Sequence, residues 1–285
     1  MTMTTTQSTY SNPVVVPSTP SEAHQKATGF TFSVLLNQAL TEPGIISQAY
    51  SRFHRYSLSN QILAAMQLQG RGMPLAPIAS YNHWLTLGRK VRKGEKALAL
   101  FMPVSIKQRE KHEETGEEAE TGKVFTRFKL ARNWFSVDQT EGETYAEPQV
   151  IPNWDAAQAF GQLGISRRRF EMVNGNVQGY ALDRTIAINP LAALPHKTRF
   201  HEVAHIVLGH TAKVGCWDTA TLPRQIEEAE AEGVAFLLCA LLDLPGLAES
   251  RGYIQSWMAG GQLPEKSTQR IFSAAQAILA AGKSK

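Results

Sequence analysis

The sequence predicts an α+β protein with two domains. Apolar residues recur at helical spacing between residues 30 and 69 and again after residue 195, whereas strand-like alternation occurs between residues 97 and 137. A proline-punctuated segment at 146–152 separates two stretches, each long enough for a modest core. We therefore expect four segments: a disordered Ser/Thr/Pro-rich leader (1–28), an N-terminal α+β domain (29–145), a linker (146–153) and a C-terminal domain (154–285).

The N-terminal domain begins with helical patterns punctuated by Pro and Gly. These residues interrupt hydrophobic periodicity and so mark helix ends and loops. In order, we expect a helix ending before Pro43-Gly44, a second over 46–56, a third over 59–69, a Gly/Pro-rich loop at 70–77 and a short helix at 81–85.

Two strand-like runs follow, at 97–104 and 124–137. The highly charged segment 107–123 separates them, and we interpret it as a solvated hairpin tip or flexible loop rather than a ligand-binding element. A turn over 138–143 then closes the domain.

The C-terminal domain is predicted to place a small sheet before an active-site helix, with further helices after it. Asn174-Gly175 is the strongest short-range hairpin signal in this half of the chain. The expected elements are a helix at 154–163, a hairpin at 170–182, a short strand at 185–189, and helices at 197–208, 223–244, around 253–259 and at 266–281.

His201, Glu202 and His205 form an HExxH motif on the predicted helix 197–208. Two histidines four residues apart on a helix share one face, so their imidazoles can bind one metal ion. HExxH on a helix is typical of a zinc site in which the glutamate is a general base. The alternative, a merely amphipathic helix, is disfavoured because buried Glu and His side chains need partners.

A catalytic zinc ion takes three protein ligands and keeps a fourth position for water. The helix predicted at 223–244 starts acidic and becomes apolar, and its acids suit either the helix dipole or a metal. Glu228 and Glu232 share a face, so we predict Glu228 as the third ligand and Glu232 as the partner of a ligand histidine. Glu230 is the alternative third ligand. We therefore expect one Zn2+ ion per chain.

The cysteine content and the sequence of the N-terminus indicate the cellular compartment. Cys216 and Cys239 have no paired spacing, which is typical of reduced thiols in a cytoplasm, and Cys216 is a less suitable zinc ligand than the acidic helix. The N-terminus lacks the basic start and apolar region of a secretory signal, and no stretch is long and apolar enough for a membrane span. We expect a cytoplasmic protein with no membrane partner.

Positive charge is concentrated in the N-terminal half. Between residues 45 and 133 there are fifteen Lys/Arg and seven Asp/Glu, and six of those acids lie in 110–120. A basic turn at 89–96 beside Tyr81 and Trp84 offers phosphate contacts next to rings on which bases can stack, as in single-stranded DNA binding. The alternative is a solvated basic surface with Trp84 in the core.

Three blocks of the N-terminal half, YSLSNQIL (56–63), WLTLGRKVRKGEKALAL (84–100) and FKLARNWFSVDQTEG (128–142), resemble the N-terminal DNA-binding domain of ArdC-type antirestriction proteins. HEVAHIVLGH (201–210) and EEAEAE (227–232) resemble the zincin-like metallopeptidase domain of the same family, which is also similar to the IrrE/ImmA type. This alignment places the family's metal-binding glutamate on Glu228. Ala229 and Glu230 stand where apolar residues are usual, so the register of the third ligand stays open.

The resemblance implies non-specific binding of single-stranded DNA and protection of a mobile element's incoming DNA from restriction. The residues expected to contact DNA are Tyr56, Asn60, Trp84, Arg89, Lys90, Arg92, Lys93 and Lys96.

Two function classes compete. In the first, the protein is a DNA-binding antirestriction factor whose metal site is not needed for that role. In the second, it is a regulatory zinc metalloprotease of the HExxH gluzincin type, and DNA binding only localises it. The sequence does not identify a protein substrate.

Proteolysis would use Glu202 to take a proton from a zinc-bound water and pass it to the leaving amine. Residues 187–189 are expected to offer an edge strand to an extended peptide. Tyr180 and His210 are candidate oxyanion donors, but a structural hydrogen bond is the favoured interpretation for each.

Overall fold

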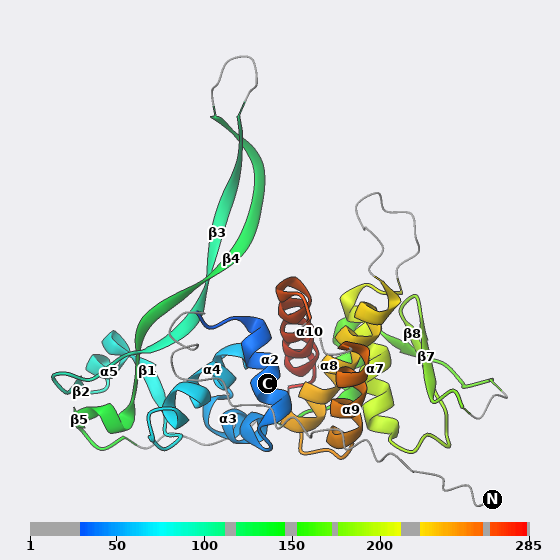
Figure 1. The fold of residues 1–285 in the computed structure, drawn as a ribbon, viewed down its shortest axis with the longest axis horizontal. Coiled ribbons are helices and arrows are strands. Elements are labelled where there is room, and N and C mark those ends of the chain that lie inside the picture. The colour runs from blue at the N-terminus through cyan, green and yellow to red at the C-terminus, as the bar shows by residue number, and fades with distance from the viewer. Residues whose placement is uncertain are drawn as a thin grey trace, which may run out of the picture.

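The computed structural model describes residues 29–111, 118–145, 153–172, 176–211, 223–258 and 263–283. Two lobes lie side by side, and a long β-ribbon projects from the first (Figure 1). Helices and strands occur in both lobes, which confirms the predicted α+β class.

The N-terminal lobe packs three helices against the base of the ribbon. α2 (Phe32–Thr41), α3 (Ile45–Phe53) and α4 (Leu58–Gln69) follow the predicted pattern. Their apolar stripes face inward, and Leu35, Ala49 and Ile62 are inaccessible to solvent. The helices end near the predicted breaks because Gly44 takes a left-handed conformation, with φ 82°, just before α3.

The ribbon pairs two long antiparallel strands, β3 (Leu98–Lys111) and β4 (Glu118–Ser136). β1 (Ile78–Ser80) adds a third strand alongside the end of β4. Both long strands reach further into the charged segment 107–123 than the sequence predicted, so both ends of that segment belong to the ribbon rather than to a loop.

A second, two-stranded sheet carries the basic turn. β2 (Arg89–Val91) pairs with β5 (Thr140–Gly142), next to the short helix α5 (Tyr81–Thr86). The turn predicted at 138–143 is therefore a 3-10 turn, η1 (Val137–Gln139), followed by a strand. Gly142, with φ 129°, is required there because a side chain would collide with the carbonyl oxygen of Gly88.

The C-terminal lobe places a three-stranded sheet beside a group of helices. Its strands are ordered β6-β8-β7, with β6 parallel and β7 antiparallel to the central strand β8. The elements are α6 (Ala156–Leu163), β6 (Ser166–Arg167), β7 (Gly179–Leu182), β8 (Thr185–Ile188), α7 (Pro195–Leu208), α8 (Arg224–Leu241), α9 (Leu247–Met258) and α10 (Glu265–Gly282).

The hairpin predicted at 170–182 is wrong in its position. The hairpin of this lobe is β7–β8, which turns at Asp183 with a positive φ of 51°. Residues 170–172 form no strand, and the Asn174-Gly175 turn lies outside the described residues. Aspartate tolerates the left-handed conformation better than most residues, which allows this turn without a glycine.

One continuous hydrophobic core runs through both lobes. Phe32 of α2 stacks on Phe101 of β3 with ring centroids 4.5 Å apart, and it also lies 5.8 Å from the ring of Phe272 in α10. α10 is placed between α2 and α4 on one side and α7 and α8 on the other (Figure 1). It therefore belongs to the packing of both lobes.

Side chains of α10 also satisfy the free backbone amides at the starts of two helices in the N-terminal lobe. Glu265 accepts hydrogen bonds from the amides of Phe32 and Ser33, at 2.8 and 3.0 Å. Gln276 accepts one from the amide of Leu58, at 2.9 Å. The first amides of a helix have no partner within the helix, so these contacts fix the orientation of α2 and α4 against α10.

Several sequence predictions fall outside the described residues. They include the leader 1–28, almost all of the linker 146–153, and Cys216. Among the described helices, none combines the length and the apolar character that crossing a bilayer requires.

We expect Glu265→Ala to lower the free energy of unfolding by about 1 kcal/mol, because two helix-start amides lose their acceptor. Glu265→Gln should cost less, since its amide oxygen can still accept. Denaturant unfolding of the full chain measures both. Glu249→Ala, at an exposed carboxylate near the start of α9, is the control and should change stability by less. Equal losses for Glu265→Ala and Glu249→Ala would contradict the capping role.

Candidate metal centre and nucleic-acid surface

Helix α7 presents His201 and His205 on one face, one turn apart. Pro195 begins the helix, where its missing N–H costs nothing, and Gly209 ends it with φ 82°. The apolar residues between the histidines, Val203 and Ala204, are fully buried and hold the helix against the core. The predicted helix and the orientation of the motif are therefore present.

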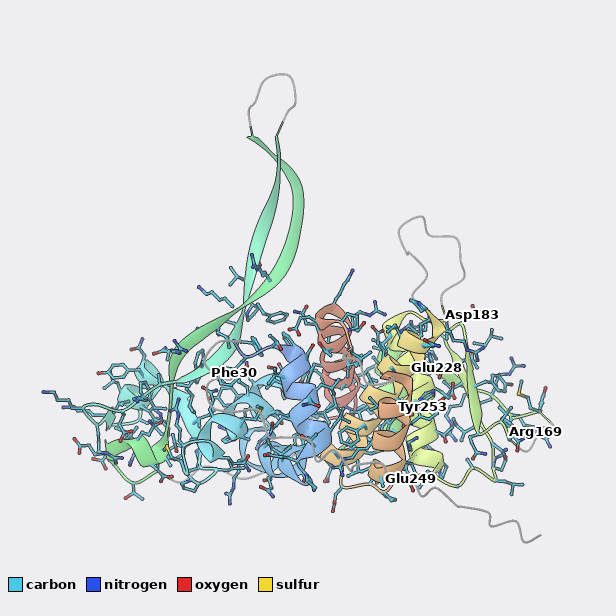
Figure 2. The ribbon with its side chains drawn as sticks, in the orientation of Figure 1. Phe30, Arg169, Asp183, Glu228, Glu249 and Tyr253 are labelled. Carbon is cyan, nitrogen blue, oxygen red and sulfur yellow. The ribbon has the colours of Figure 1, made fainter. Side chains whose placement is uncertain are left out.

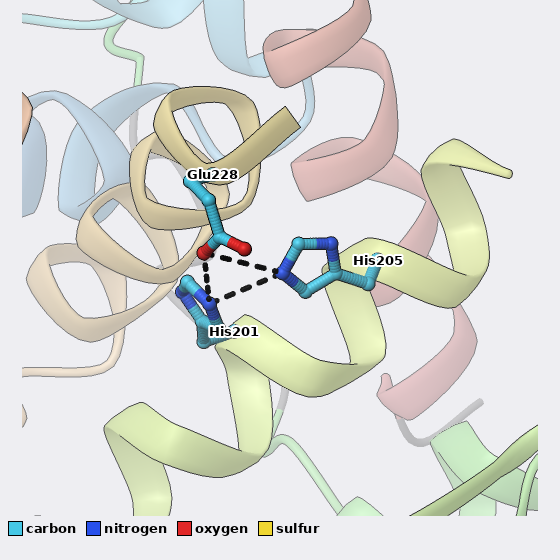
Figure 3. Close-up of side chains that lie close together, drawn as sticks. All are labelled: His201, His205 and Glu228. Atoms are coloured by element: carbon cyan, nitrogen blue, oxygen red, sulfur yellow. Dashed lines mark hydrogen bonds and ion pairs between the residues drawn. The ribbon is translucent and has the colours of Figure 1, made fainter. Parts of the chain in front are cut away.

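Three ligand atoms converge at this face (Figure 3). His201 Nε2 lies 3.2 Å from His205 Nε2 and 3.3 Å from Glu228 Oε2, and His205 Nε2 lies 3.7 Å from the same oxygen. Ligands about 2 Å from a tetrahedral zinc ion are separated by roughly 3.3 Å. The spacing and the donor chemistry of these three side chains therefore fit a divalent metal ion, and within the described residues no other His/Cys/Asp/Glu group meets this test.

His201 is held from behind by an acid and a lysine. Its Nδ1 lies 3.0 Å from Glu232 Oε2, and the other oxygen of Glu232 lies 2.6 Å from Lys197 Nζ. Glu232 is buried, so Lys197 balances its charge. Glu232 thus stands where the sequence analysis expected a partner of a ligand histidine. Lys197 was missed, although its place one turn before His201 on the same helix was a usable signal.

His205 has a different neighbour. Its Nδ1 lies 3.0 Å from Nδ1 of His210, whose Nε2 lies 3.0 Å from Glu230 Oε2. Glu230 is inaccessible to solvent and points to His210, so it does not join the three ligand atoms. The alternative assignment of Glu230 as third ligand is contradicted by this geometry. His210 uses both ring nitrogens in these contacts, which agrees with the structural role that the sequence analysis favoured for it over that of an oxyanion donor.

Hydrogen bonds set the charges around the centre. Burial acts to lower the pKa of His201, but its contacts with Glu228 and Glu232 outweigh burial and raise the pKa to about 9. The two histidines hold the pKa of Glu228 far below its usual range. In the metal-free protein His201 is therefore a cation between two carboxylates, and a divalent metal ion would replace that charge.

Glu202 is buried beside the two histidines, with 8% of its surface exposed. Burial raises the pKa of its carboxyl group, and the neighbouring His201 and His205 oppose that shift. A carboxylate with a raised pKa is a better base, so the chemistry of Glu202 suits proton transfer at this centre.

The sheet next to the centre only partly matches the expected peptide-binding edge. β8 is the central strand, but β6 pairs only with Thr185 and Ile186. Residues 187–188 therefore have only β7 as a strand partner within the described sheet. Tyr180 lies on β7 opposite Ala187, with its ring 5.9 Å from that of Phe170.

The predicted DNA-contacting residues separate into buried and exposed groups. Trp84 is inaccessible to solvent, and its Nε1 donates to the carbonyl oxygen of Phe135. Asn60 is buried, and its side-chain amide bonds both backbone groups of Phe101. Tyr56 donates to the carbonyl oxygen of Ile78. The burial of Trp84 and Asn60 argues against the prediction that these two residues contact DNA.

The side chains of the basic turn differ in their contacts rather than in burial alone, since Arg92 is itself exposed. Arg89 donates to Thr140 and to backbone carbonyl oxygens of β5, and Arg92 pairs with Glu95 at 2.8 Å. Lys90, Lys93 and Lys96 are exposed. The arginines therefore shape the turn, and the lysines are left to face a ligand. Tyr81, on the neighbouring α5, is 43% exposed and provides the accessible ring that Trp84 does not.

The two sites lie in different lobes. α5 and β2 stand at one end of the molecule, whereas Glu228 lies in the helical part of the other lobe (Figure 2).

Comparison with known proteins gives a family match for part of the first lobe. Residues 37–134 match the family described as the N-terminal domain of anti-restriction factor ArdC. Two crystal structures of antirestriction ArdC from plasmid R388, one metal-free and one bound to Mn(II), align with 21% and 20% sequence identity. Each alignment covers 88% of this chain and 94% of the other chain, with a TM-score of 0.48. A comparison with curated proteins gave no match.

We expect Glu228→Ala to weaken Zn2+ binding by more than the roughly 10–100-fold loss typical of residues behind the ligands, because it removes one of three ligand atoms. Competition with a chromophoric chelator measures the dissociation constant. Glu227→Ala, one position earlier on α8 and outside the cluster, is the matched control and should bind like the unmodified chain. Unchanged affinity in Glu228→Ala would rule out this ligand set.

Proposed function

We propose that the protein is an antirestriction factor that binds single-stranded DNA. The premise is that this is an ArdC-type chain whose residues 37–134 form the family's N-terminal domain. The match over these residues is the observation that carries the proposal. The DNA would come from a mobile element, and its recognition would be largely independent of sequence.

The exposed surface around the basic turn supports this binding mode. Lys90, Lys93 and Lys96 present three cations on a short turn, and Tyr81 lies on the adjacent helix. Phosphate contacts from lysines together with an aromatic ring for base stacking suit single strands, because neither contact depends on the base sequence. The ligand surface proposed here differs from the one that the sequence suggested, with Tyr81 in place of Trp84.

The second lobe is proposed to bind one divalent metal ion through His201, His205 and Glu228. Zinc is the preferred candidate because a His2Glu ligand set with a free position is typical of catalytic zinc. When bound, the ion would supply a Lewis acid that polarises a carbonyl group and acidifies a water molecule. Mn(II) is included in metal assays because the R388 protein has been crystallised with it.

The chain's own residues provide the remaining parts of a peptidase site. Glu202 would accept a proton from the attacking water and donate it to the leaving amine. The buried position and raised pKa of Glu202 favour this activity as the second candidate function, with DNA binding serving to localise the protease.

We expect the triple change Lys90→Ala, Lys93→Ala, Lys96→Ala to weaken binding of all single-stranded sequences alike. Each phosphate contact on a single strand contributes roughly 0.7 to the slope of log affinity against log salt, so the slope should fall by about 2. Fluorescence anisotropy with labelled oligonucleotides over a salt series measures this. Arg167→Ala, Arg168→Ala, Arg169→Ala removes the same charge from the other lobe, where Figure 2 shows Arg169 at the outer edge.

If both triple variants lose affinity equally, net charge rather than the basic turn governs binding, and the proposed surface is wrong. Tyr81→Ala tests stacking separately and should cost about 1–3 kcal/mol of binding free energy. Tyr81→Phe keeps the ring and should bind like the unmodified chain.

We expect Glu202→Gln to retain both metal and restriction protection while abolishing any metal-dependent proteolysis. The change preserves side-chain volume but removes the base. Protection is measured as the survival of transferred DNA in a host with an active restriction enzyme, and metal content is measured on the purified variant. Loss of protection in a variant that keeps its metal would favour the protease as the primary function.

A further inference from the structure

A chain of polar side chains leads away from the candidate metal centre behind His205. It passes from His205 to His210, from His210 to Glu230 of α8, and from Glu230 to Arg270 of α10. The final contact joins Arg270 Nε to Glu230 Oε2 at 3.1 Å. His205 lies in the last turn of α7, His210 follows two residues after that helix, and Glu230 and Arg270 lie on α8 and α10. Neither proposed function assigns a role to His210, Glu230 or Arg270.

The proton positions in this chain of contacts follow from its chemistry. Glu230 faces a guanidinium, which can only donate, so it is an ionised acceptor. His210 must then carry a proton on Nε2 to donate to Glu230. A metal ion bound at Nε2 of His205 would leave that ring's proton on Nδ1, so Nδ1 of His210 would act as the acceptor. The Nδ1 of His205, 3.0 Å away, must supply the proton between the two rings. His205 is thereby left with an unprotonated Nε2, the atom that faces His201 and Glu228.

Two of these side chains, Glu230 and His210, are shielded from solvent. Glu230 is inaccessible to solvent, and 4% of the His210 side chain is exposed, so water does not compete for these groups. Arg270 also donates from Nη2 to the carbonyl oxygen of Leu208, at the last turn of α7, at 2.8 Å. Its Nη2 lies 3.4 Å from His210 Nε2, a nitrogen that cannot accept while it carries a proton. One guanidinium thus fixes both the acid and the end of the helix that bears the histidines.

We propose that His210, Glu230 and Arg270 are positioning residues that fix the ring orientation and tautomer of His205 for metal binding. This inference rests on the proposed metal site. The corresponding support of His201 is shorter, because Glu232 contacts that ring directly and Lys197 balances the acid. The two histidines of the motif are therefore held by separate sets of residues, each ending in a cation.

The test uses the full chain loaded with Zn2+. Long-range 15N–1H NMR of the histidine rings should show His210 as the neutral Nε2–H tautomer and His205 protonated at Nδ1. His210→Leu should weaken Zn2+ binding by roughly 10–100-fold, the range typical of residues that orient metal ligands. His210→Gln, whose amide can accept with its oxygen and donate with its nitrogen, should restore affinity to within a few-fold of the unmodified chain.

Phe272→Leu separates positioning from stability. Phe272 lies on α10 but packs on Phe32 of the other lobe, so this change should lower the melting temperature and leave Zn2+ affinity unchanged. A His210 ring protonated on Nδ1 in the metal-loaded chain would overturn the proposal. So would a folded His210→Leu variant with unchanged affinity.

If His210→Leu does not fold, the ring tautomers of the unmodified chain and the Zn2+ affinity of the His210→Gln variant still test the proposal. An unmodified chain that binds no Zn2+ would instead overturn the metal site itself, and the role of His210 with it.

Discussion

The C-terminal lobe is organised around two largely buried histidines, because each of their ring nitrogens needs a partner. His201 and His205 share one face of α7, and their Nε2 atoms lie only 3.2 Å apart. Water has little access to either ring, so protein groups must accept or donate at the other nitrogens. Three carboxylates of α8 meet this demand: Glu228 lies between the two Nε2 atoms, Glu232 contacts His201, and Glu230 acts through His210. The acidic start of α8 is thus explained by the histidines it faces.

α10 links this centre to the other lobe. Arg270 contacts Glu230 and the end of α7, whereas Glu265 and Gln276 satisfy the amides at the starts of α2 and α4. Phe32 and Phe272 complete the contact through the shared core. One helix therefore fixes the position of the N-terminal lobe relative to the candidate metal centre.

The basic turn illustrates how one sequence feature serves two purposes. Arg89 and Arg92 direct their guanidinium groups to β5 and Glu95, because a planar group with five donors suits several backbone carbonyl oxygens at once. The neighbouring lysines, whose flexible stems carry a single compact charge, extend into solvent. Trp84 lies beneath this surface as part of the core, and Tyr81 on the same short helix lies above it.

The sequence by itself determined the helices, the α+β class and the convergence of His201 and His205, because helical spacing fixes which residues share a face. It also placed Glu228 and Glu232 on the side of α8 that meets the histidines. Tertiary structure alone decided between Glu228 and Glu230, since that choice depends on how α8 is rotated against α7. It also decided which ring beside the basic turn is buried, because Trp84 and Tyr81 lie only three residues apart on a short helix. Arg270 could not be foreseen at all: it reaches the centre from a helix forty residues beyond Glu230, and no local pattern records which distant helix packs there.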